Sequence, residues 1–239
     1  KFELKFDEYL KLFKLVKEKG SIPLFTPFDI SSLNKLIDHN ENFFKISSAD
    51  LSNLELVKKA AENSEHLILS TGMHDEDQII DTNKFLIELG ANPIFLHCNS
   101  TYPAPYQDIN LYYIERLKRI TKSRYVGYSG HERGFHIPLA AIALGAKFIE
   151  KHFTIDRGME GPDHKVSLLP SEFKEMVSKS RDIEISLGKK NNPKIVSQGE
   201  IINRESLSKS IYANKIIKRN NIIKSSDLTL KSPATGLDY

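Results

Sequence analysis

Two histidines stand where neighbouring strands of a predicted sheet end. His131 follows the β-prone run 124–128 at a Ser-Gly-His break, and His152 lies at the end of the next run, 147–153. The carboxyl ends of parallel strands share one edge of an α/β fold, where ligands bind. A single histidine there is more often a hydrogen-bonded loop residue, but two neutral imidazoles that converge can hold a divalent metal ion. We therefore expect His131 and His152 to form part, though not the whole, of a metal site.

Small hydroxyl groups follow the other predicted strands, and one strand carries a lysine. Taken one at a time, each Ser or Thr also suits a helix N-cap. Together with backbone N–H groups they can surround a phosphate while a lysine supplies charge. Lys45 stands inside an apolar strand, and a buried lysine needs a partner or a function. The rim is therefore predicted to bind an anion through Thr26, Lys45, Ser48, Ser70, Ser100 and Ser129.

The elements that position these residues alternate along the chain. Runs rich in Ile, Phe, Leu and Val predict strands over 22–25, 43–47, 66–69, 93–96, 124–128 and 147–153. Helical patterns predict helices over 4–18, 31–38, 54–62, 75–89, 111–120, 138–144 and 170–187. Strands with little polar alternation are typical of parallel sheets buried on both faces. Six strands behind a leading helix predict a (β/α)8 TIM barrel that lacks its first two strands. A doubly wound sheet is the alternative, but no Gly-rich nucleotide turn follows a strand.

The domain organisation follows from where the periodicity stops. Residues 1–188 are predicted to form the partial barrel, and residues 189–207, which show no periodicity, a linker. Residues 208–239, with short strands expected at 209–213 and 228–230, are predicted to begin a truncated second domain. The chain starts with Lys1 rather than Met, so we expect it to be a fragment.

Composition excludes several classes of protein. No apolar run among the 239 residues is long enough to span a bilayer, and no signal peptide is visible. The net charge of +3 comes with dispersed lysines, which does not suggest nucleic-acid binding. Cys98 is the single cysteine, so an intrachain disulfide is impossible and a reducing compartment fits. We expect a cytoplasmic protein with neither membrane nor nucleic-acid partners.

The strand-end motifs, taken as a series, resemble the sialic acid (N-acetylneuraminate) synthase family, whose members condense phosphoenolpyruvate with a sugar aldehyde. The similarity runs from about residue 20 to 190, in order and without large gaps. The tail from Ser210 to Pro233 is similar to the start of the antifreeze-like (SAF) domain of that family. The motifs are Thr26-Pro27-Phe28, Lys45-Ile46-Ser47-Ser48, Ser70-Thr71-Gly72-Met73, His97-Cys98-Asn99-Ser100-Thr101-Tyr102-Pro103, Gly127-Tyr128-Ser129-Gly130-His131-Glu132, Glu150-Lys151-His152-Phe153-Thr154 and Gly161-Pro162-Asp163-His164.

The resemblance implies a metal-dependent transferase of carbohydrate biosynthesis. Its metal, usually Mn²⁺ with Mg²⁺ or Co²⁺ as alternatives, would be held by His131 and His152. Phosphoenolpyruvate would be bound by the anion-site residues named above, and the acceptor sugar would be contacted by Asp50, Tyr102 and Asp163. Lys45, Asp50 and the two histidines are the implied catalytic residues. The products would be a nonulosonic acid and phosphate, released with C–O cleavage. The full-length protein would be a domain-swapped homodimer.

Three departures from the family pattern bear on the acceptor. The first two family strands are absent, and with them a Glu and a Lys that the family uses. Asp50 stands where many members have the longer Glu. Ser232 replaces the arginine of a Lys-Arg-Pro-Gly pattern that recognises an N-acetyl group. The acceptor that the resemblance implies is N-acetylmannosamine, but the loss of this arginine argues for a related diacetamido sugar instead, as in legionaminate and pseudaminate synthases.

Two other functions are compatible with the same residues. Lys45 could be the amine nucleophile of a Schiff-base aldolase. Alternatively, the chain could be a catalytically inactive, truncated binding protein, because an open barrel exposes sheet edges that invite pairing. For residues 1–239 alone we expect weak or no activity.

Overall fold

The computed structural model describes residues 4–237, and the chain divides into two compact units, Lys1–Gly188 and Lys189–Tyr239. In the described part of the first unit, five parallel strands alternate with helices. The strands are β1 (Phe43–Ile46), β2 (His66–Ser70), β3 (Ile94–Cys98), β4 (Val126–Gly130) and β5 (Phe148–Lys151). The helices are α1 (Phe6–Glu18), α2 (Ile30–Asp38), α3 (Leu54–Glu62), α4 (Glu76–Glu88), α5 (Tyr113–Thr121), α6 (His136–Ala143) and α7 (Pro170–Leu187). Short 3₁₀ turns lie at η1 (Ser48–Asp50) and η2 (Tyr106–Asp108).

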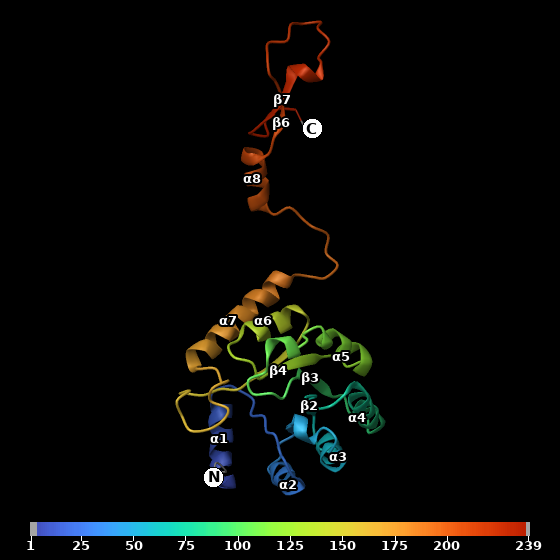
Figure 1. Ribbon diagram of the computed structural model, residues 1–239, viewed down its shortest axis with the longest axis vertical. Coiled ribbons are helices and arrows are strands. Elements are labelled where there is room, and N and C mark those ends of the chain that lie inside the picture. Colours follow the sequence, from blue (N-terminus) through green and yellow to red (C-terminus); the bar gives the residue numbers. More distant parts are fainter. Residues whose placement is uncertain (1–3, 238–239) are drawn as a thin grey trace. The chain divides into compact units, whose positions relative to one another are not determined.

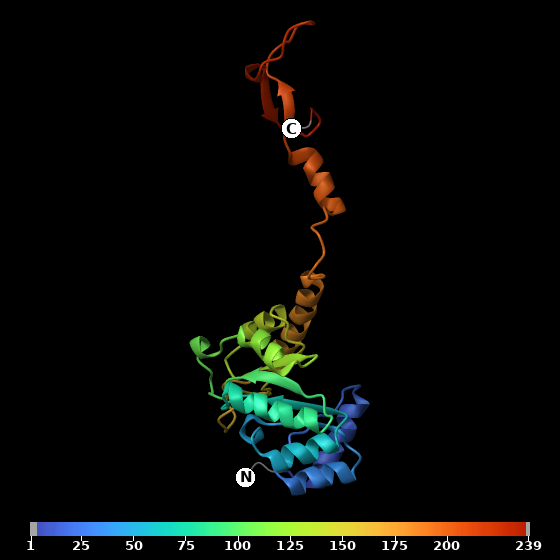
Figure 2. The same cartoon turned by 90° about the vertical axis from the view of Figure 1, so that its right-hand side faces the viewer.

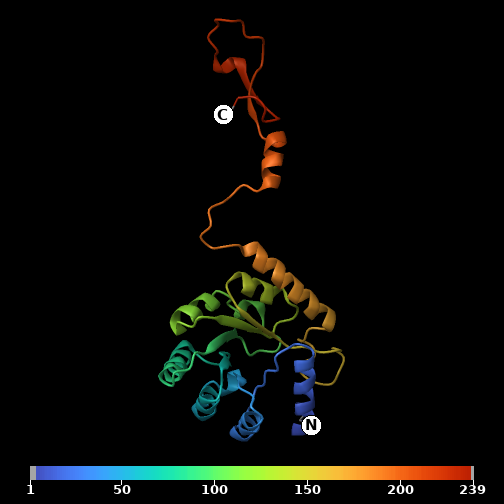
Figure 3. The ribbon, with the colours of Figure 1, turned by 180° about the vertical axis from the view of Figure 1, so that it is seen from behind.

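The sheet has the order β1-β2-β3-β4-β5, and every neighbouring pair is parallel. In a flat sheet, strands about 4.8 Å apart would leave β1 and β5 about 19 Å apart. Lys45 on β1 nevertheless reaches Glu150 on β5, with Nζ 3.3 Å from Oε1, so the sheet is strongly curled. Helices α2 to α5 follow one another around the outside of the strands (Figures 1 and 3) and run side by side in the view of Figure 2. The architecture is a curled, parallel part of a barrel.

The core has two parts because successive side chains of a strand point to opposite faces. Outward-facing residues such as Phe44, Phe95 and Tyr128 are almost fully buried and pack with the apolar stripes of the helices. Inside the curl, a second apolar cluster is formed by Phe43, Ile68, Ile94, Leu96 and Phe148. The residues two positions further along most of these strands are polar. This pattern places an apolar layer beneath a polar layer at the carboxyl ends of the strands.

One predicted strand is not formed. Residues 22–25 make a single parallel bridge, Phe25 with Phe44, in which the Lys45 backbone N–H donates to the Phe25 carbonyl oxygen at 2.8 Å. Ile22 is 75% exposed, and no strand among residues 4–237 pairs with the outer edge of this segment. A strand needs a ladder partner to be held extended, so the apolar run alone was insufficient. The other five predicted strands are confirmed.

The second unit contains helix α8 (Gln198–Leu207) and a hairpin of β6 (Ser210–Ala213) and β7 (Leu228–Lys231), with the 3₁₀ turn η3 (Ser225–Asp227) before β7. We expected an irregular linker over 189–207, but its second half is helical. The reason is a capping box: Glu200 N–H donates to Ser197 Oγ at 3.3 Å, and Ser197 N–H donates to Glu200 Oε2 at 2.8 Å. The two short strands predicted in the tail are confirmed, and residues 238–239 lie outside the described residues.

Among residues 4–237, no helix is both long enough and apolar enough to cross a bilayer.

Candidate functional site

A cavity of about 490 Å³ opens at the carboxyl ends of the strands, inside the curl. Nine of the predicted site residues line it: Thr26, Lys45, Ser48, Ser70, Ser100, Tyr102, Ser129, His131 and His152. They come from the five strands or the residues just after them, and from the segment after residue 25, so parallel topology gathers residues that are far apart in sequence. The cavity therefore brings together the residues of the predicted anion site and the histidine pair.

The two histidines lie side by side, with ring centroids 5.2 Å apart and planes inclined at 58°. The carbonyl oxygen of Asn99 can only accept a hydrogen bond, so Nδ1–H of His131 donates to it at 2.7 Å, which leaves Nε2 with its lone pair. Burial lowers the pKa of His131, and burial followed by the neighbouring His131 lowers the pKa of His152. Both rings are thus held in the neutral form that a metal ion requires.

These rings fit a divalent metal ion as part of a ligand set. A metal-binding histidine typically donates its other ring N–H to a carbonyl or carboxylate, as His131 does to Asn99. Residues 4–237 hold no group of three or more His, Cys, Asp or Glu side chains arranged to bind a metal. Among the described residues, the structure therefore brings together two side chains that could bind a metal ion, which is fewer than a complete metal site needs.

Tyr102 forms one wall beside the histidines. Its ring centroid lies 4.1 Å from that of His131 and 5.7 Å from that of His152. The side chain is about half exposed, and burial of the remainder raises the pKa of its hydroxyl, so the group stays a neutral hydrogen-bond donor. Tyr102 can therefore cover a ligand held by the two imidazoles.

The two predicted aspartates lie outside the cavity lining. Asp163 has Oδ2 3.9 Å from Nδ1 of His152, with its side chain 55% exposed. Asp50, in η1, accepts a hydrogen bond from Ser47 Oγ at 2.9 Å. Both carboxylates therefore belong to the outer part of the region, where they could meet only a ligand that extends beyond the cavity.

Lys45 has a partner that the sequence analysis did not predict. Its side chain is buried, and Nζ lies 3.3 Å from Oε1 of Glu150. The second oxygen of Glu150, Oε2, is buried without a hydrogen-bond partner among the described residues, as is Oγ of Ser70. Buried polar atoms are normally paired, so two unpaired ones in one cavity lining indicate space for a polar ligand. Glu150 lies on β5 two residues before His152, which directly follows the strand, so the alternation of side chains could have identified Glu150 as a neighbour of His152.

The hydroxyl groups of the rim are held by short-range contacts. Ser48 Oγ accepts a hydrogen bond from the Gly72 N–H at 3.1 Å, and Cys98 Sγ lies 3.6 Å from Ser48 Oγ and 3.7 Å from Ser100 Oγ. A Cβ at position 72 would lie 2.1 Å from Ser100 Oγ and 2.9 Å from Ser48 Oγ. Glycine is therefore needed here for the backbone to approach both hydroxyls.

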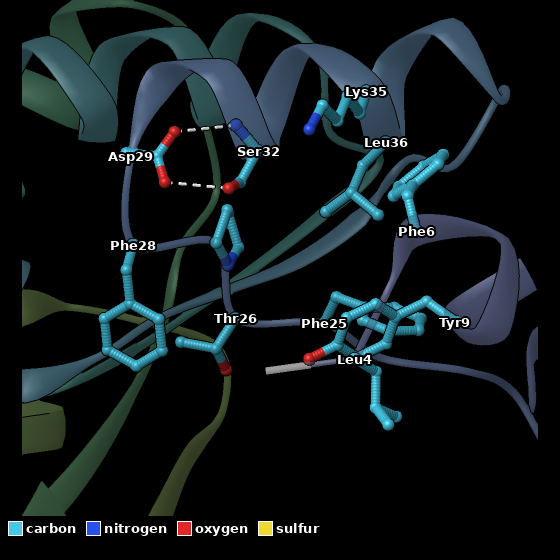
Figure 4. Close-up of a pocket in the computed structure, with 11 residues that line it drawn as sticks. Leu4, Phe6, Tyr9, Phe25, Thr26, Phe28, Asp29, Ser32, Lys35 and Leu36 are labelled. Carbon is cyan, nitrogen blue, oxygen red and sulfur yellow. Dashed lines mark hydrogen bonds between the residues drawn. The ribbon is translucent and has the colours of Figure 1, made fainter. Parts of the chain in front are cut away.

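A second pocket of about 390 Å³ lies between α1 and α2 (Figure 4). Its walls are mostly apolar, with Phe6, Tyr9, Phe25 and Leu36 among them. Its carboxylate, Asp29, is occupied as the N-cap of α2, where it accepts hydrogen bonds from Ser32 N–H at 2.8 Å and Ser32 Oγ at 2.7 Å. This pocket lacks the convergent polar groups of the strand-end cavity.

Residues 1–192 match the NeuB family. The chain is 41% identical over 240 residues to the N,N'-diacetyllegionaminic acid synthase of Campylobacter jejuni, covering 99% of this chain and 71% of that protein. It is 34% identical over 229 residues to the human N-acetylneuraminate-9-phosphate synthase, covering 96% of this chain and 63% of that protein. The crystal structure of an N-acetylneuraminic acid synthetase from Leptospira borgpetersenii matches with a TM-score of 0.78 and 36% identity, covering 86% of this chain and 72% of that one. The chain thus spans roughly two thirds of the length of these relatives.

Proposed function

Because the chain belongs to the NeuB family, we propose that it is part of a nonulosonic acid synthase, with residues 1–188 belonging to its barrel. The reaction condenses phosphoenolpyruvate with an N-acetylated amino-sugar aldehyde and water to give a nonulosonic acid and phosphate. The main support for this proposal is that a single cavity contains residues suited to binding an anion and residues suited to binding a metal ion. The cavity holds a buried cation with a row of hydroxyls for an anion, and two neutral imidazoles for a metal ion.

Phosphoenolpyruvate presents a phosphate and a carboxylate on a three-carbon frame. Lys45 Nζ supplies the positive charge, and the hydroxyls of Thr26, Ser48, Ser70, Ser100 and Ser129 supply donors around it. The unpaired Oγ of Ser70 gains a partner when the anion binds. Several fixed donors hold the methylene carbon in register with the aldehyde, which removes most of the entropic barrier to the bimolecular step.

The metal ion is proposed to be Mn²⁺, with Mg²⁺ or Co²⁺ as alternatives, and His131 and His152 would hold it. When bound, such an ion polarises the aldehyde oxygen as a Lewis acid. The imidazoles contribute by staying neutral in the buried site, and Tyr102 contributes by covering them.

The proposed reaction forms a C–C bond between the two substrates and breaks the C–O bond to phosphate. The methylene carbon of phosphoenolpyruvate forms a C–C bond to the aldehyde carbon, and the aldehyde oxygen takes up a proton. Water then adds to the electron-poor C2, and cleavage of the bond between C2 and the bridging oxygen releases phosphate. Glu150 is suited to orient this water, because its Oε2 is buried, unpaired and next to the anion-binding Lys45. Glu150 thereby aids the loss of the water proton.

The acceptor is proposed to be N-acetylmannosamine or a related diacetamido sugar. Support comes from the relatives named for N,N'-diacetyllegionaminic and N-acetylneuraminic acid chemistry. Asp163 and Asp50 are proposed to contact hydroxyl or amide groups of a sugar that extends out of the cavity, which their positions near the cavity support. Residues 208–239 are proposed to begin an antifreeze-like domain that, in a domain-swapped homodimer of the full-length protein, contributes to the partner's site.

The test is phosphate release from phosphoenolpyruvate with a panel of amino-sugar aldehydes, phosphorylated and not, with and without Mn²⁺. We expect aldehyde-dependent release in the full-length protein and weak or no release by residues 1–239 alone. His131→Ala and His152→Ala should abolish the metal-dependent rate, whereas His66→Ala, which alters a largely exposed histidine at the start of β2, should not. Metal-independent turnover, or borohydride trapping of a substrate on Lys45, would replace this proposal with a Schiff-base aldolase.

A further inference from the structure

A buried ion pair joins the ends of β4 and β5 directly behind the two histidines. Lys151 Nζ lies 2.8 Å from Oε1 of Glu132, and both side chains are 0% exposed. Tyr128, itself 1% exposed, donates its hydroxyl hydrogen to the other oxygen, Oε2, at 2.6 Å. Glu132 directly follows His131 and Lys151 directly precedes His152. The cluster of Tyr128, Glu132 and Lys151 therefore touches both histidines through the backbone.

The side chains of the cluster are not exposed to a substrate: Lys151 is among the residues that line the cavity, but its side chain is 0% exposed, so it meets the cavity through its backbone. Successive side chains of a strand point to opposite faces, so Lys151 leaves β5 on the face opposite to Glu150 and His152. Both carboxylate oxygens of Glu132 are already occupied, by Lys151 and by Tyr128. A buried ion pair is weak evidence for stability, because apolar residues of similar volume often serve as well. Its presence is better explained by what it positions.

The register of the sheet shows what needs to be positioned. The pairing between β4 and β5 ends at Gly130 with Lys151, so His131 and Glu132 lie beyond the ladder. There Lys151 Nζ also donates a hydrogen bond to the backbone carbonyl oxygen of Glu132. This bond ties the backbone just after His131 to the residue just before His152, where sheet hydrogen bonds no longer do so.

Gly130 makes this arrangement possible. A Cβ at position 130 would lie 2.7 Å from Oε1 and 2.8 Å from Oε2 of Glu132, and 2.8 Å from Cε1 of Tyr128. The absence of a side chain lets the carboxylate fold back against the strand. Along Tyr128-Ser129-Gly130-His131-Glu132, the three central residues line the cavity, whereas the side chains of Tyr128 and Glu132 belong to the buried cluster.

We propose that Tyr128, Glu132 and Lys151 form a positioning cluster that sets the separation of the His131 and His152 rings. The proposal concerns the distance between the two histidine rings. It rests on the proposed function only in that a metal ion is what the two rings would bind. These three are positioning residues and not catalytic ones, because they act through the backbone at 131 and 152.

The test compares Lys151→Met and Tyr128→Phe with a control, Leu117→Ala, which opens a cavity in the fully buried core but leaves the three side chains of the cluster unchanged. In metal-free, ¹³C-histidine-labelled protein, the wild type should show nuclear Overhauser contacts between the His131 and His152 rings. Leu117→Ala should keep these contacts, Tyr128→Phe should weaken them, and Lys151→Met should lose them. Mn²⁺ affinity, followed by the electron paramagnetic resonance signal of the free ion, should fall about 10- to 100-fold in Lys151→Met.

The outcomes separate the two proposals. Retention of wild-type ring contacts in Lys151→Met, or their absence in the wild type, overturns the positioning cluster and leaves the synthase standing. If Lys151→Met does not fold, unchanged ring contacts in Tyr128→Phe overturn it instead. Ring contacts that respond as expected in a protein that binds no Mn²⁺ would support the cluster and count against the metal-dependent synthase.

Discussion

Lys45 and Glu150 belong to the two edge strands of the sheet, yet their side chains meet across the inside of the curl. The ion pair leaves Lys45 with one carboxylate oxygen at 3.3 Å and leaves the other oxygen free. The cavity therefore holds the ammonium group of Lys45 and the carboxylate of Glu150, of which a single oxygen is paired.

Replacing Lys45 by Met should weaken binding of phosphoenolpyruvate about 10- to 100-fold, the value of one charge-assisted hydrogen bond in a buried site. Isothermal titration calorimetry measures this without turnover, so it applies to residues 1–239 alone. Lys58→Met, which removes a lysine of α3 that is about half exposed, serves as the control and should bind as the wild type does. Equal affinity of Lys45→Met and Lys58→Met would remove Lys45 from the anion site.

Replacing Glu150 by Gln should lower kcat in the full-length protein while leaving the affinity for phosphoenolpyruvate equal or higher. The amide keeps the size of the side chain but no longer accepts a proton, and it removes a negative charge from beside an anionic substrate. Steady-state phosphate release gives kcat, and a titration gives the affinity. A Glu150→Gln variant with wild-type kcat would show that water is oriented elsewhere; Glu62→Gln on α3 is the control.

Replacing Gly72 by Ala should weaken phosphoenolpyruvate binding with little change in stability. The new methyl group would stand 2.1 Å from Ser100 Oγ and 2.9 Å from Ser48 Oγ, so both hydroxyls must rotate away from their present positions. Gly199→Ala in α8, where a Cβ meets nothing within 4 Å, is the matched control and should leave binding unchanged. Unaltered affinity in Gly72→Ala would mean that these hydroxyls do not contact the anion.

His97 should make the protein less stable in mild acid. Burial lowers the pKa of His97, and its Nε2–H donates to the Ile109 carbonyl oxygen at 2.5 Å between the rings of Tyr113 and Tyr128. The unfolded chain then binds a proton more readily than the folded one. The contribution of neutral His97 to the free energy of unfolding is therefore fully present above the unfolded pKa of about 6.5. It is lost as the pH falls from there through the lowered pKa of His97 in the folded protein. Urea unfolding at pH 7.5 and 5.5 should show a smaller loss of stability for His97→Gln than for the wild type. Equal losses would contradict the assignment.

Much of the barrel could be predicted because its signals are local. Helices α3 and α7 begin and end where expected: Asn53 caps the first, with its Oδ1 accepting from Leu56 N–H at 3.4 Å, and Pro170 opens the second. Helix α8 was missed although Ser197 and Glu200 have the spacing of a capping box, because its weak apolar periodicity hid it. The segment 22–25 was over-predicted, since strand formation depends on a partner that its own residues do not specify.

Part of the site could be predicted because the carboxyl ends of parallel strands meet at one edge of the sheet. This rule predicts that the histidines, the hydroxyl groups and Lys45 lie near one another. It does not predict which side chains of β1 and β5 meet across the inside of the curled sheet. Glu150 was passed over as part of an apolar run, although it lies two residues before His152, which directly follows β5. The contacts of Glu132 with Tyr128 and Lys151 depend on β4 and β5 being neighbours and on the backbone fold at Gly130, which only the three-dimensional structure reveals.

Cys98, the single cysteine of the sequence, lines the cavity between Ser48 and Ser100 and is only 7% exposed. A thiol-directed alkylating probe that labels the folded chain must therefore enter the same space as a substrate. Labelling kinetics would then report occupancy at a single known atom, with no need for an introduced tag, and would allow candidate ligands to be ranked even in a chain that does not turn over.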